Sequence, residues 1–251
     1  MAIIRLKDLL KEFEFGEKLF ADPSDPIISG GNSTEWSAFL RKVYSGDYES
    51  NTNDETYLLK ALKTYLSVSD KNDITSDMLK DLLLIRNQFP NILTPPSDIT
   101  TLFRGMTMDI ESLIKAVQEA TDVIKGSAGG YGSERLALKG VSRSITSRSR
   151  SFISMSTDYR VAERFPATTR IGDIIQDGRY PVTAVVSMQD VKDKVLMNPE
   201  FLDAIIEFKE SECWVVGSDI PVSDLIITNP MYRYVGPAVD KLVQALKSKG
   251  V

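Results

Sequence analysis

The spacing of apolar residues in the N-terminal part of the chain predicts amphipathic α-helices. Apolar side chains recur every three or four positions over residues 36–44, after Asn32, which has Glu35 three positions on as in a capping box. The same spacing returns at residues 57–65 and 78–83. Stripes of this kind are typical of helices that pack one face against a core.

Start and stop signals bound this helical part. A Ser/Thr/Asp-rich stretch at residues 75–77 precedes the third stripe and is typical of a helix N-terminus. Pro90, Pro95 and Pro96 follow, and proline ends helices because it lacks the amide donor and its ring clashes with the preceding turn. We therefore expect a helical N-terminal lobe over residues 1–94, either as a domain of its own or packed into one domain with the rest.

Beyond the prolines the pattern predicts short strands mixed with helices. Strands are expected at residues 101–103, 151–157, 181–188, 212–216 and 224–228, and helices at 109–120, 159–165, 199–206 and 237–247. The strands do not alternate strictly with long helices, as they would in a doubly wound parallel sheet. The fold class expected is therefore α+β.

Composition removes several classes of catalytic site. The chain has 251 residues, of which 42% are apolar, so it can bury a sizeable core. Its one cysteine, Cys213, excludes a disulfide framework within the chain. Because there is no histidine, Ser-His-Asp triads and Cys-His dyads are excluded, and no metal site is expected.

Charge and hydropathy indicate which partners to expect. Residues 1–20 interrupt their apolar positions with charge every two or three residues, whereas a signal peptide or a membrane span needs an unbroken apolar stretch. A soluble, intracellular chain with no membrane partner is therefore expected. The net charge of -5 argues against a general nucleic-acid coat, although it allows a local basic patch.

Two low-complexity segments each allow two interpretations. The glycine-rich residues 126–132 lack both common phosphate-loop patterns, so a flexible connection is favoured over a phosphate cradle. The serine/arginine run at residues 142–151 could contact RNA or an acidic partner through Arg143, Arg148 and Arg150. Its alternation equally suits a solvated edge strand, which is the interpretation we favour.

Three further segments carry candidate chemistry. An apolar strand ends on Arg104 and Gly105, where a guanidinium can bind phosphate and a glycine lets a ligand approach the backbone. The later strand puts Ser154 and Ser156 on one face together with Phe152, because side chains alternate along a strand.

The third segment is a pair of carboxylates. Glu210 and Glu212 are expected on one face at the mouth of a strand that is otherwise apolar. Like charges at such a place are costly, so their presence favours a functional role.

In this order the three segments resemble the R-S-E class of mono-ADP-ribosyltransferases. That family carries an aromatic or aliphatic-Arg-Gly strand, then an F-x-S-T-S strand, then E-x-E. The likeness spans residues 95–228, and residues 158–165 look like the Val-Ala-x-x-Phe helix that follows the serine motif in the family. Met155 departs from the pattern, since the family usually has threonine there.

The resemblance implies a fold and a reaction. The fold would be two mostly antiparallel sheets around an NAD cleft, preceded by a helical lobe, with residues 95–251 as the catalytic core. NAD would be consumed as a substrate, and no metal is implied. Nicotinamide leaves as a neutral molecule, so the reaction needs a carboxylate to stabilise the positive charge on the ribose and no general acid.

By the same resemblance the carboxylates and the serines have roles. Glu212 would hold the nicotinamide-ribose hydroxyl and stabilise the developing cation. Glu210 would orient the acceptor and help to deprotonate it. Ser154 would fix Glu212 by a hydrogen bond, and Ser156 would join it in lining the NAD site.

The remaining site residues would bind the dinucleotide. Arg104 would engage it directly, and Gly105 would offer backbone bonds to the nicotinamide amide. Phe165 is the candidate for stacking on the nicotinamide ring.

The family includes secreted toxins, eukaryotic enzymes and phage enzymes that modify host machinery. The expected intracellular character favours a phage enzyme that acts in the host cytoplasm. Such an enzyme could also be carried in the virion. Its target would be a protein arginine, on host RNA polymerase or a ribosome-associated protein. A toxin catalytic subunit, an NAD glycohydrolase and a non-catalytic RNA- or protein-binding module are the alternatives.

Overall fold

The computed structural model describes most of the chain beyond residue 52. The described ranges are residues 53–67, 74–128, 133–146, 151–168, 178–205, 210–228 and 237–250. The helix expected at residues 36–44 lies outside these ranges, and so do Arg148 and Arg150.

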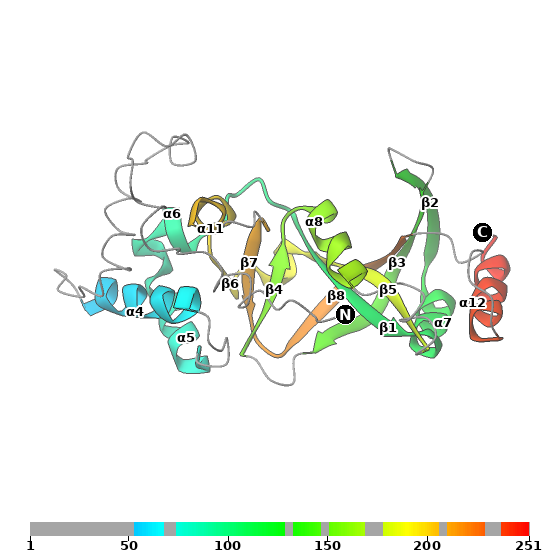
Figure 1. Ribbon diagram of the computed structural model, residues 1–251, viewed down its shortest axis with the longest axis horizontal. Helices are drawn as coiled ribbons and strands as arrows, with labels where there is room; N and C mark the ends of the chain where they lie inside the picture. The colour runs from blue at the N-terminus through cyan, green and yellow to red at the C-terminus, as the bar shows by residue number, and fades with distance from the viewer. Residues whose placement is uncertain are drawn as a thin grey trace.

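The fold is α+β, as expected, and is built on one eight-stranded sheet in which every pairing is antiparallel. The strands are β1 Thr101–Asp109, β2 Asp122–Ala128, β3 Ser133–Thr146, β4 Phe152–Ser156, β5 Arg179–Ser187, β6 Val195–Leu196, β7 Glu212–Val216 and β8 Asp219–Thr228. Their order is β2-β3-β8-β5-β1-β4-β7-β6 (Figure 1).

The resemblance implies two sheets, whereas the structure has one. In this sheet, the pairing between β1 and β4 is very short. β1 pairs with β5 along its whole length, from Thr101 to Asp109. It pairs with β4 only at Phe103, which lies opposite Ser156. A five-stranded part and a three-stranded part are thus joined at a single residue pair.

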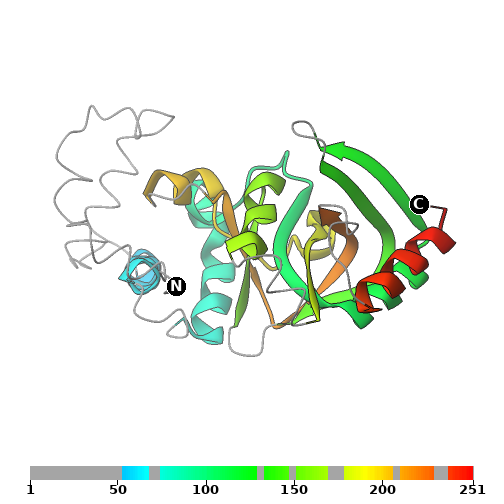
Figure 2. The same ribbon diagram turned by 45° about the vertical axis from the view of Figure 1, so that its right-hand side comes forward.

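Most of the helices lie at the two ends of the sheet, whereas α8 packs over β1 in its middle. They are α4 Asn53–Ser67, α5 Ser76–Ile85, α6 Pro90–Leu93, α7 Ile110–Glu119, α8 Tyr159–Arg164, α10 Met188–Val191, α11 Pro199–Ile205 and α12 Pro237–Ser248, with 3-10 turns η2 Arg86–Gln88 and η3 Phe165–Thr168. α4, α5, α6 and α11 lie at the β6 end, while α12 packs on α7 at the β2 end (Figures 1 and 2).

Several expectations about the elements are wrong, each for a local reason. Pro90 begins α6 instead of ending a helix, because the first position of a helix needs no amide donor. The glycine-rich segment is not a flexible connection over residues 126–128, which belong to β2. Residues 129–132 lie outside the described residues.

The serine/arginine run is a strand, and it lies inside the sheet order. Its residues 142–146 belong to β3, which stands between β2 and β8. Arg143 and the residues after it pair with β8, whereas the pairing of β2 with β3 ends at Lys139. From Arg143 onward, β3 is therefore paired on one side, with β8, and is unpaired by β2 on the other. Arg143 forms an ion pair with Glu119 of α7 at 3.1 Å.

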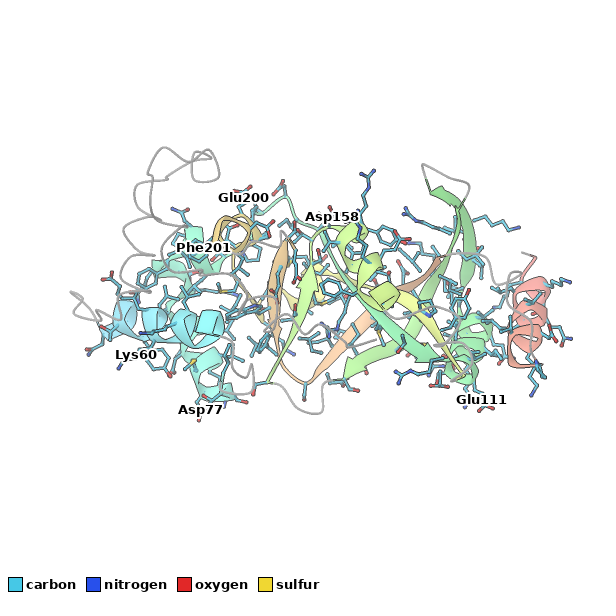
Figure 3. The ribbon with its side chains drawn as sticks, in the orientation of Figure 1. Lys60, Asp77, Glu111, Asp158, Glu200 and Phe201 are labelled. Carbon is cyan, nitrogen blue, oxygen red and sulfur yellow. The ribbon has the colours of Figure 1, made fainter. Side chains whose placement is uncertain are left out.

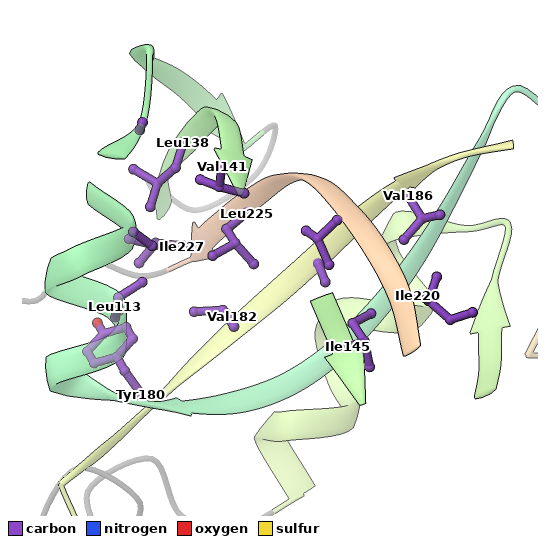
Figure 4. Packing of buried hydrophobic residues seen from close by; sticks show 14 of the residues in the cluster. Leu113, Leu138, Val141, Ile145, Tyr180, Val182, Val186, Ile220, Leu225 and Ile227 are labelled. Atoms are coloured by element: carbon purple, nitrogen blue, oxygen red, sulfur yellow. The ribbon is translucent and has the colours of Figure 1, made fainter. Parts of the chain in front are cut away.

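Two hydrophobic clusters hold the fold together. The larger one lies between the sheet and helices α7 and α12 and includes Leu113, Val182 and Ile227 (Figure 4). The second joins α4, α5 and α6 to the three-stranded part, with Phe152 and Trp214 in its middle. The described part of the N-terminal helices thus shares its core with β4, β6, β7 and α11.

Asp109 links β1 to α7 and makes the start of that helix pH-sensitive. Its Oδ1 accepts the N–H of Ser112 at 2.7 Å, as expected of an N-cap residue. The hydrogen bonds from Ser112 lower the pKa of Asp109. Since the folded pKa is depressed, the stabilisation is present above the unfolded value of about 3.9 and is lost as pH falls through the folded pKa.

Replacing Asp109 with alanine is expected to lower the free energy of unfolding by about 1 kcal/mol at pH 7. The difference from wild type should shrink below about pH 4, because the protonated carboxyl caps less well. Urea denaturation at pH 7 and pH 3.5 measures both values. Asp109→Asn is the matched control, since asparagine caps without titrating; an equal wild-type-to-alanine difference at both pH values would contradict the capping role.

Candidate functional site

The three segments singled out in the sequence lie on three neighbouring strands. Arg104 is on β1, Ser154 on β4 and Glu212 on β7, and the sheet order places β4 between the other two. Residues separated by 50 positions or more in the chain are therefore adjacent in the sheet (Figure 1).

Arg104 bridges β1 and β4 where their pairing is short. It is half-buried, and its Nη1 donates to the carbonyl oxygen of Ser154. Because β1 and β4 pair only at Phe103 and Ser156, this side-chain bond spans the place where the two strands separate. A guanidinium carries five N–H donors, so the bond to Ser154 is compatible with binding a phosphate.

The register of β4 and β7 decides which serine faces which residue. Ser156 lies directly opposite Glu212, and Ser154 lies opposite Trp214. Ser154 is thus the diagonal neighbour of Glu212 on the same face of the sheet. The ring of Phe152 packs on Trp214 at 5.1 Å and closes this face on the side of the second hydrophobic cluster.

Ser156 binds the backbone that leads into the E-x-E segment. Its hydroxyl donates to the carbonyl oxygen of Glu210 at 2.7 Å and accepts from the N–H of Asp158 at 3.0 Å. The sequence placed Ser156 only among NAD-lining residues, whereas the structure makes it a support for the glutamate turn as well.

The two glutamates do not follow the strand alternation that was expected. β7 begins at Glu212, and the residue before it, Ser211, has φ 47°. That value lies in the left-handed region, so the period-two rule does not extend from Glu212 back to Glu210. Glu212 is buried, at 3% exposed, while Glu210 is half-buried.

Sequence reasoning missed the residues that hold this turn. The carboxylate of Asp203, on α11, accepts both the N–H and the hydroxyl of Ser211, at 2.9 and 3.1 Å. Thr157 donates its N–H to the carbonyl oxygen of Ser211 at 2.8 Å. No sequence pattern marks Asp203, because it lies on α11, which ends at Ile205, and it reaches Ser211 only through the tertiary fold.

Gly105 has a packing role that the sequence did not indicate. A Cβ at this position would overlap the carbonyl oxygen of Ala162 and lie 2.6 Å from Cδ of Pro166. The C-terminal end of α8 and the start of η3 therefore rest directly on β1. This contact fills the side-chain direction of Gly105, which is perpendicular to the direction of its backbone N–H and carbonyl.

The docking of α8 also depends on a residue of β3, a strand that is separated from β1 by β8 and β5. Arg135 of β3 stacks over the ring of Tyr159 at 4.3 Å and forms an ion pair with Glu163 at 2.9 Å. Tyr159 in turn meets the ring of Phe103 edge-on at 5.7 Å. Tyr159 and Glu163 are both on α8, so two contacts fix this helix over β1.

Phe165 comes directly after α8, beside the residue that rests on Gly105. Its side chain is 46% exposed, which is unusual for a large apolar ring. The fold thus brings Phe165 close in sequence and space to the Gly105 contact at Pro166. The two residues assigned to the nicotinamide end of NAD are accordingly neighbours.

Cys213 is not a nucleophile in this site. It is buried and lies opposite Met155, on the sheet face away from Glu212. Burial raises the pKa of its thiol, and the charges of Glu212 and Asp203 raise it further. Among the described residues, no group of three or more Cys, Asp or Glu side chains could hold a metal ion.

A cavity of about 310 Å³ lies over β1, β3, β5 and β8, on the face of the sheet that carries Phe103. It is lined by Thr100, Thr101, Phe103, Ala137, Lys139, Val185, Ser187, Ser223, Asp224 and Ile226. None of Arg104, Ser154 and Glu212 lines it. Arg143 is also remote in the sheet order, since β3 is separated from β1 by β8 and β5.

The chain matches no protein-family model, and it has no significant match among curated proteins or solved structures. In the described part of the chain, no helix combines the length and the apolar character that crossing a membrane would require.

Proposed function

We propose that this chain is an NAD-dependent mono-ADP-ribosyltransferase that acts on a protein. The observation that carries the proposal is the adjacency of β1, β4 and β7. Arg104 binds the backbone of Ser154, and Ser156 lies opposite Glu212. The three strands that carry these residue types in sequence order are thus neighbours in the sheet, which supports the proposal.

The residues present suit NAD as a substrate. A dinucleotide needs a cation for its phosphates, a carboxylate for its ribose hydroxyls and an apolar surface for its nicotinamide ring. Arg104, Glu212 and the half-exposed ring of Phe165 supply groups of these three kinds. We propose that NAD binds where β1 and β4 separate beyond the Phe103 and Ser156 pair.

In this proposal each side chain has one task. NAD, when bound, supplies a glycosidic bond whose electron pair passes to the cationic nicotinamide nitrogen as the bond breaks. The Glu212 carboxylate hydrogen-bonds the ribose hydroxyl and stabilises the positive charge on the sugar. Glu210 orients the acceptor and takes its proton as the acceptor nitrogen bonds to the ribose carbon that nicotinamide leaves. Gly105 offers its backbone to the nicotinamide amide.

The test of the activity uses NAD labelled on its adenylate phosphate. Purified protein is incubated with the label and a bacterial lysate, and the protein and RNA fractions are read separately together with released nicotinamide. Label in the protein fraction is expected. Nicotinamide release without any label would identify a glycohydrolase, and no turnover with retained RNA binding would identify a binding module.

The acceptor is the second part of the proposal. By resemblance, a glutamate at the position of Glu210 goes with arginine as the acceptor, and a host RNA polymerase or ribosome-associated protein is the target class. We therefore propose a phage enzyme that works in the host cytoplasm. Identification of the labelled protein in the lysate, followed by mapping of the modified residue, tests both statements.

Replacing Glu210 with glutamine is expected to reduce transfer by roughly a hundredfold and hydrolysis by less than about tenfold. The reason is that water needs less orientation and deprotonation than a bulky acceptor. Protein label and free ADP-ribose, measured in the same reaction, give the two rates. An equal loss of both would contradict the division of labour between Glu210 and Glu212.

A further inference from the structure

The turn between the two glutamates has an unusual backbone. Ser211, the only residue between Glu210 and Glu212, has φ 47°. Residues with a Cβ rarely adopt this left-handed conformation, because the Cβ approaches the carbonyl oxygen. Contacts outside the turn are therefore needed to hold it.

Those contacts come from two directions. Both oxygens of the Asp203 carboxylate bind Ser211, one at its N–H and one at its hydroxyl. From the residue that follows β4, the hydroxyl of Thr157 donates to the carbonyl oxygen of Ser211 at 3.3 Å, in addition to the Thr157 N–H. The peptide groups on both sides of Ser211 are thus fixed, and strain is concentrated where the surrounding structure specifies the backbone.

The helix that carries Asp203 is tied to α6 at its start. Asn198, just before α11, donates its N–H to the carbonyl of Ile92 at 2.8 Å and its side-chain amide to the carbonyl of Asn91 at 3.0 Å. Its Oδ1 accepts from the N–H of Glu200 at 3.0 Å and so begins α11. Phe201 lies in the second hydrophobic cluster (Figure 3). These contacts fix the start of α11, the helix that carries Asp203.

The conformation of Ser211 decides how the two glutamates are arranged. If Ser211 were extended, β7 would continue backwards and Glu210 would lie on the same face as Glu212, where two carboxylates repel. In the left-handed conformation the chain turns at Ser211, which separates the half-buried Glu210 from the buried Glu212.

We infer that Asp203 is a positioning residue that holds Ser211 left-handed and thereby sets how ADP-ribose is divided between a protein acceptor and water. This inference rests on the proposed function. Without the Asp203 carboxylate the turn relaxes, Glu210 loses its place beside the acceptor, and transfer falls. Hydrolysis, which depends on Glu212, falls less.

The primary test is Asp203→Ala, with the ratio of protein label to free ADP-ribose as the readout. The ratio is expected to drop by roughly tenfold, since small misplacements of an orienting group have effects of this size or larger. Glu200→Ala is the matched control: it removes an exposed carboxylate from the same helix and should leave the ratio unchanged.

A rescue variant separates positioning from a general structural effect. In the Asp203→Ala background, Ser211→Gly is expected to recover much of the ratio, because glycine adopts the left-handed conformation without a clamp. If Asp203→Ala does not unfold cooperatively, Ser211→Ala replaces it, since it removes only the hydroxyl bond and should lower the ratio by about twofold to threefold.

The outcomes distinguish this inference from the proposed function. A wild-type protein that releases no nicotinamide, with or without lysate, contradicts both. An active wild type together with folded Asp203→Ala and Ser211→Ala variants that keep the wild-type ratio overturns only the role of Asp203. A loss in Asp203→Ala that Ser211→Gly does not relieve also overturns it, because conformation would then not be the cause.

Discussion

Replacing Glu212 with glutamine is expected to abolish protein labelling and nicotinamide release together, each by at least about a hundredfold. Glutamine keeps the size and one acceptor oxygen of the side chain but removes its charge. In the proposed mechanism that charge is what stabilises the cationic ribose, for a protein acceptor and for water alike. The expected defect is therefore in the rate of turnover, with a smaller change in the affinity for NAD.

The burial of Glu212 makes this a large effect. The carboxylate is 3% exposed and lies beside Trp214 in a face closed by Phe152, where water screens charge weakly. A carboxylate so placed acts on a nearby cation more strongly than an exposed one would. Replacing an exposed glutamate of the same chain shows how large the loss of turnover is without burial.

Glu200→Gln is the matched control, because Glu200 is an exposed carboxylate on α11 that lies outside the E-x-E turn (Figure 3). It should label protein like the wild type. Thermal unfolding of both variants should remain cooperative, so that a loss of activity is assigned to chemistry. A folded Glu212→Gln protein with wild-type turnover would remove the basis of the proposed mechanism.

The parts of the fold that follow from local pattern were predicted well. In α4 and α5 the expected apolar stripes are the buried faces, with Leu58, Leu62, Leu79 and Leu82 in one cluster. The start of α5 is also as expected, since the Thr75 hydroxyl accepts the N–H of Met78. Helical spacing and caps are properties of a few consecutive residues, so the sequence alone carries them.

The strands that form by pairing with a distant segment of the chain were not predicted from the sequence. β2 and β3 contain glycine, serine and arginine in place of a clean apolar alternation, and β3 is a strand because it pairs with β8. The register shift in that pairing coincides with Gly140, whose φ is 63° and whose N–H binds Asp224. Such an arrangement is fixed by two segments that are far apart in the chain.

The candidate site was likewise predicted only in part. Residue types and their order named Arg104, Ser154 and Glu212, and the sheet brings their strands together. The arrangement of Glu210 could not be predicted, because it depends on a left-handed Ser211 that is held by Asp203. A spacing rule for strands fails wherever a residue outside the strand imposes another conformation.

Replacing Gly105 with alanine is expected to lower the free energy of unfolding by more than about 3 kcal/mol, or to prevent folding. The added Cβ would overlap the carbonyl oxygen of Ala162 and lie 2.6 Å from Pro166. A backbone carbonyl cannot rotate away as a flexible side chain can. The whole of α8 must therefore move away from β1, against the ion pair and ring contact that Arg135 makes with it.

Gly126→Ala is the matched control, since the nearest atom to its added Cβ, the carbonyl oxygen of Arg135, is 4.0 Å away. That variant should change stability by no more than about 1 kcal/mol, and in the stabilising direction, because alanine restricts the unfolded chain. Urea denaturation of both variants measures the difference. Equal stabilities would mean that α8 does not rest on β1 at Gly105.

The two roles given to Gly105 can be separated by this pair of measurements. If glycine were required only for backbone bonds to nicotinamide, Gly105→Ala would fold normally and lose affinity for NAD. If the contact with α8 dominates, the variant loses stability before its activity can be compared. We expect the second result, because the overlap involves main-chain atoms of α8, whereas backbone hydrogen bonding lies in the plane of the sheet and is compatible with a Cβ.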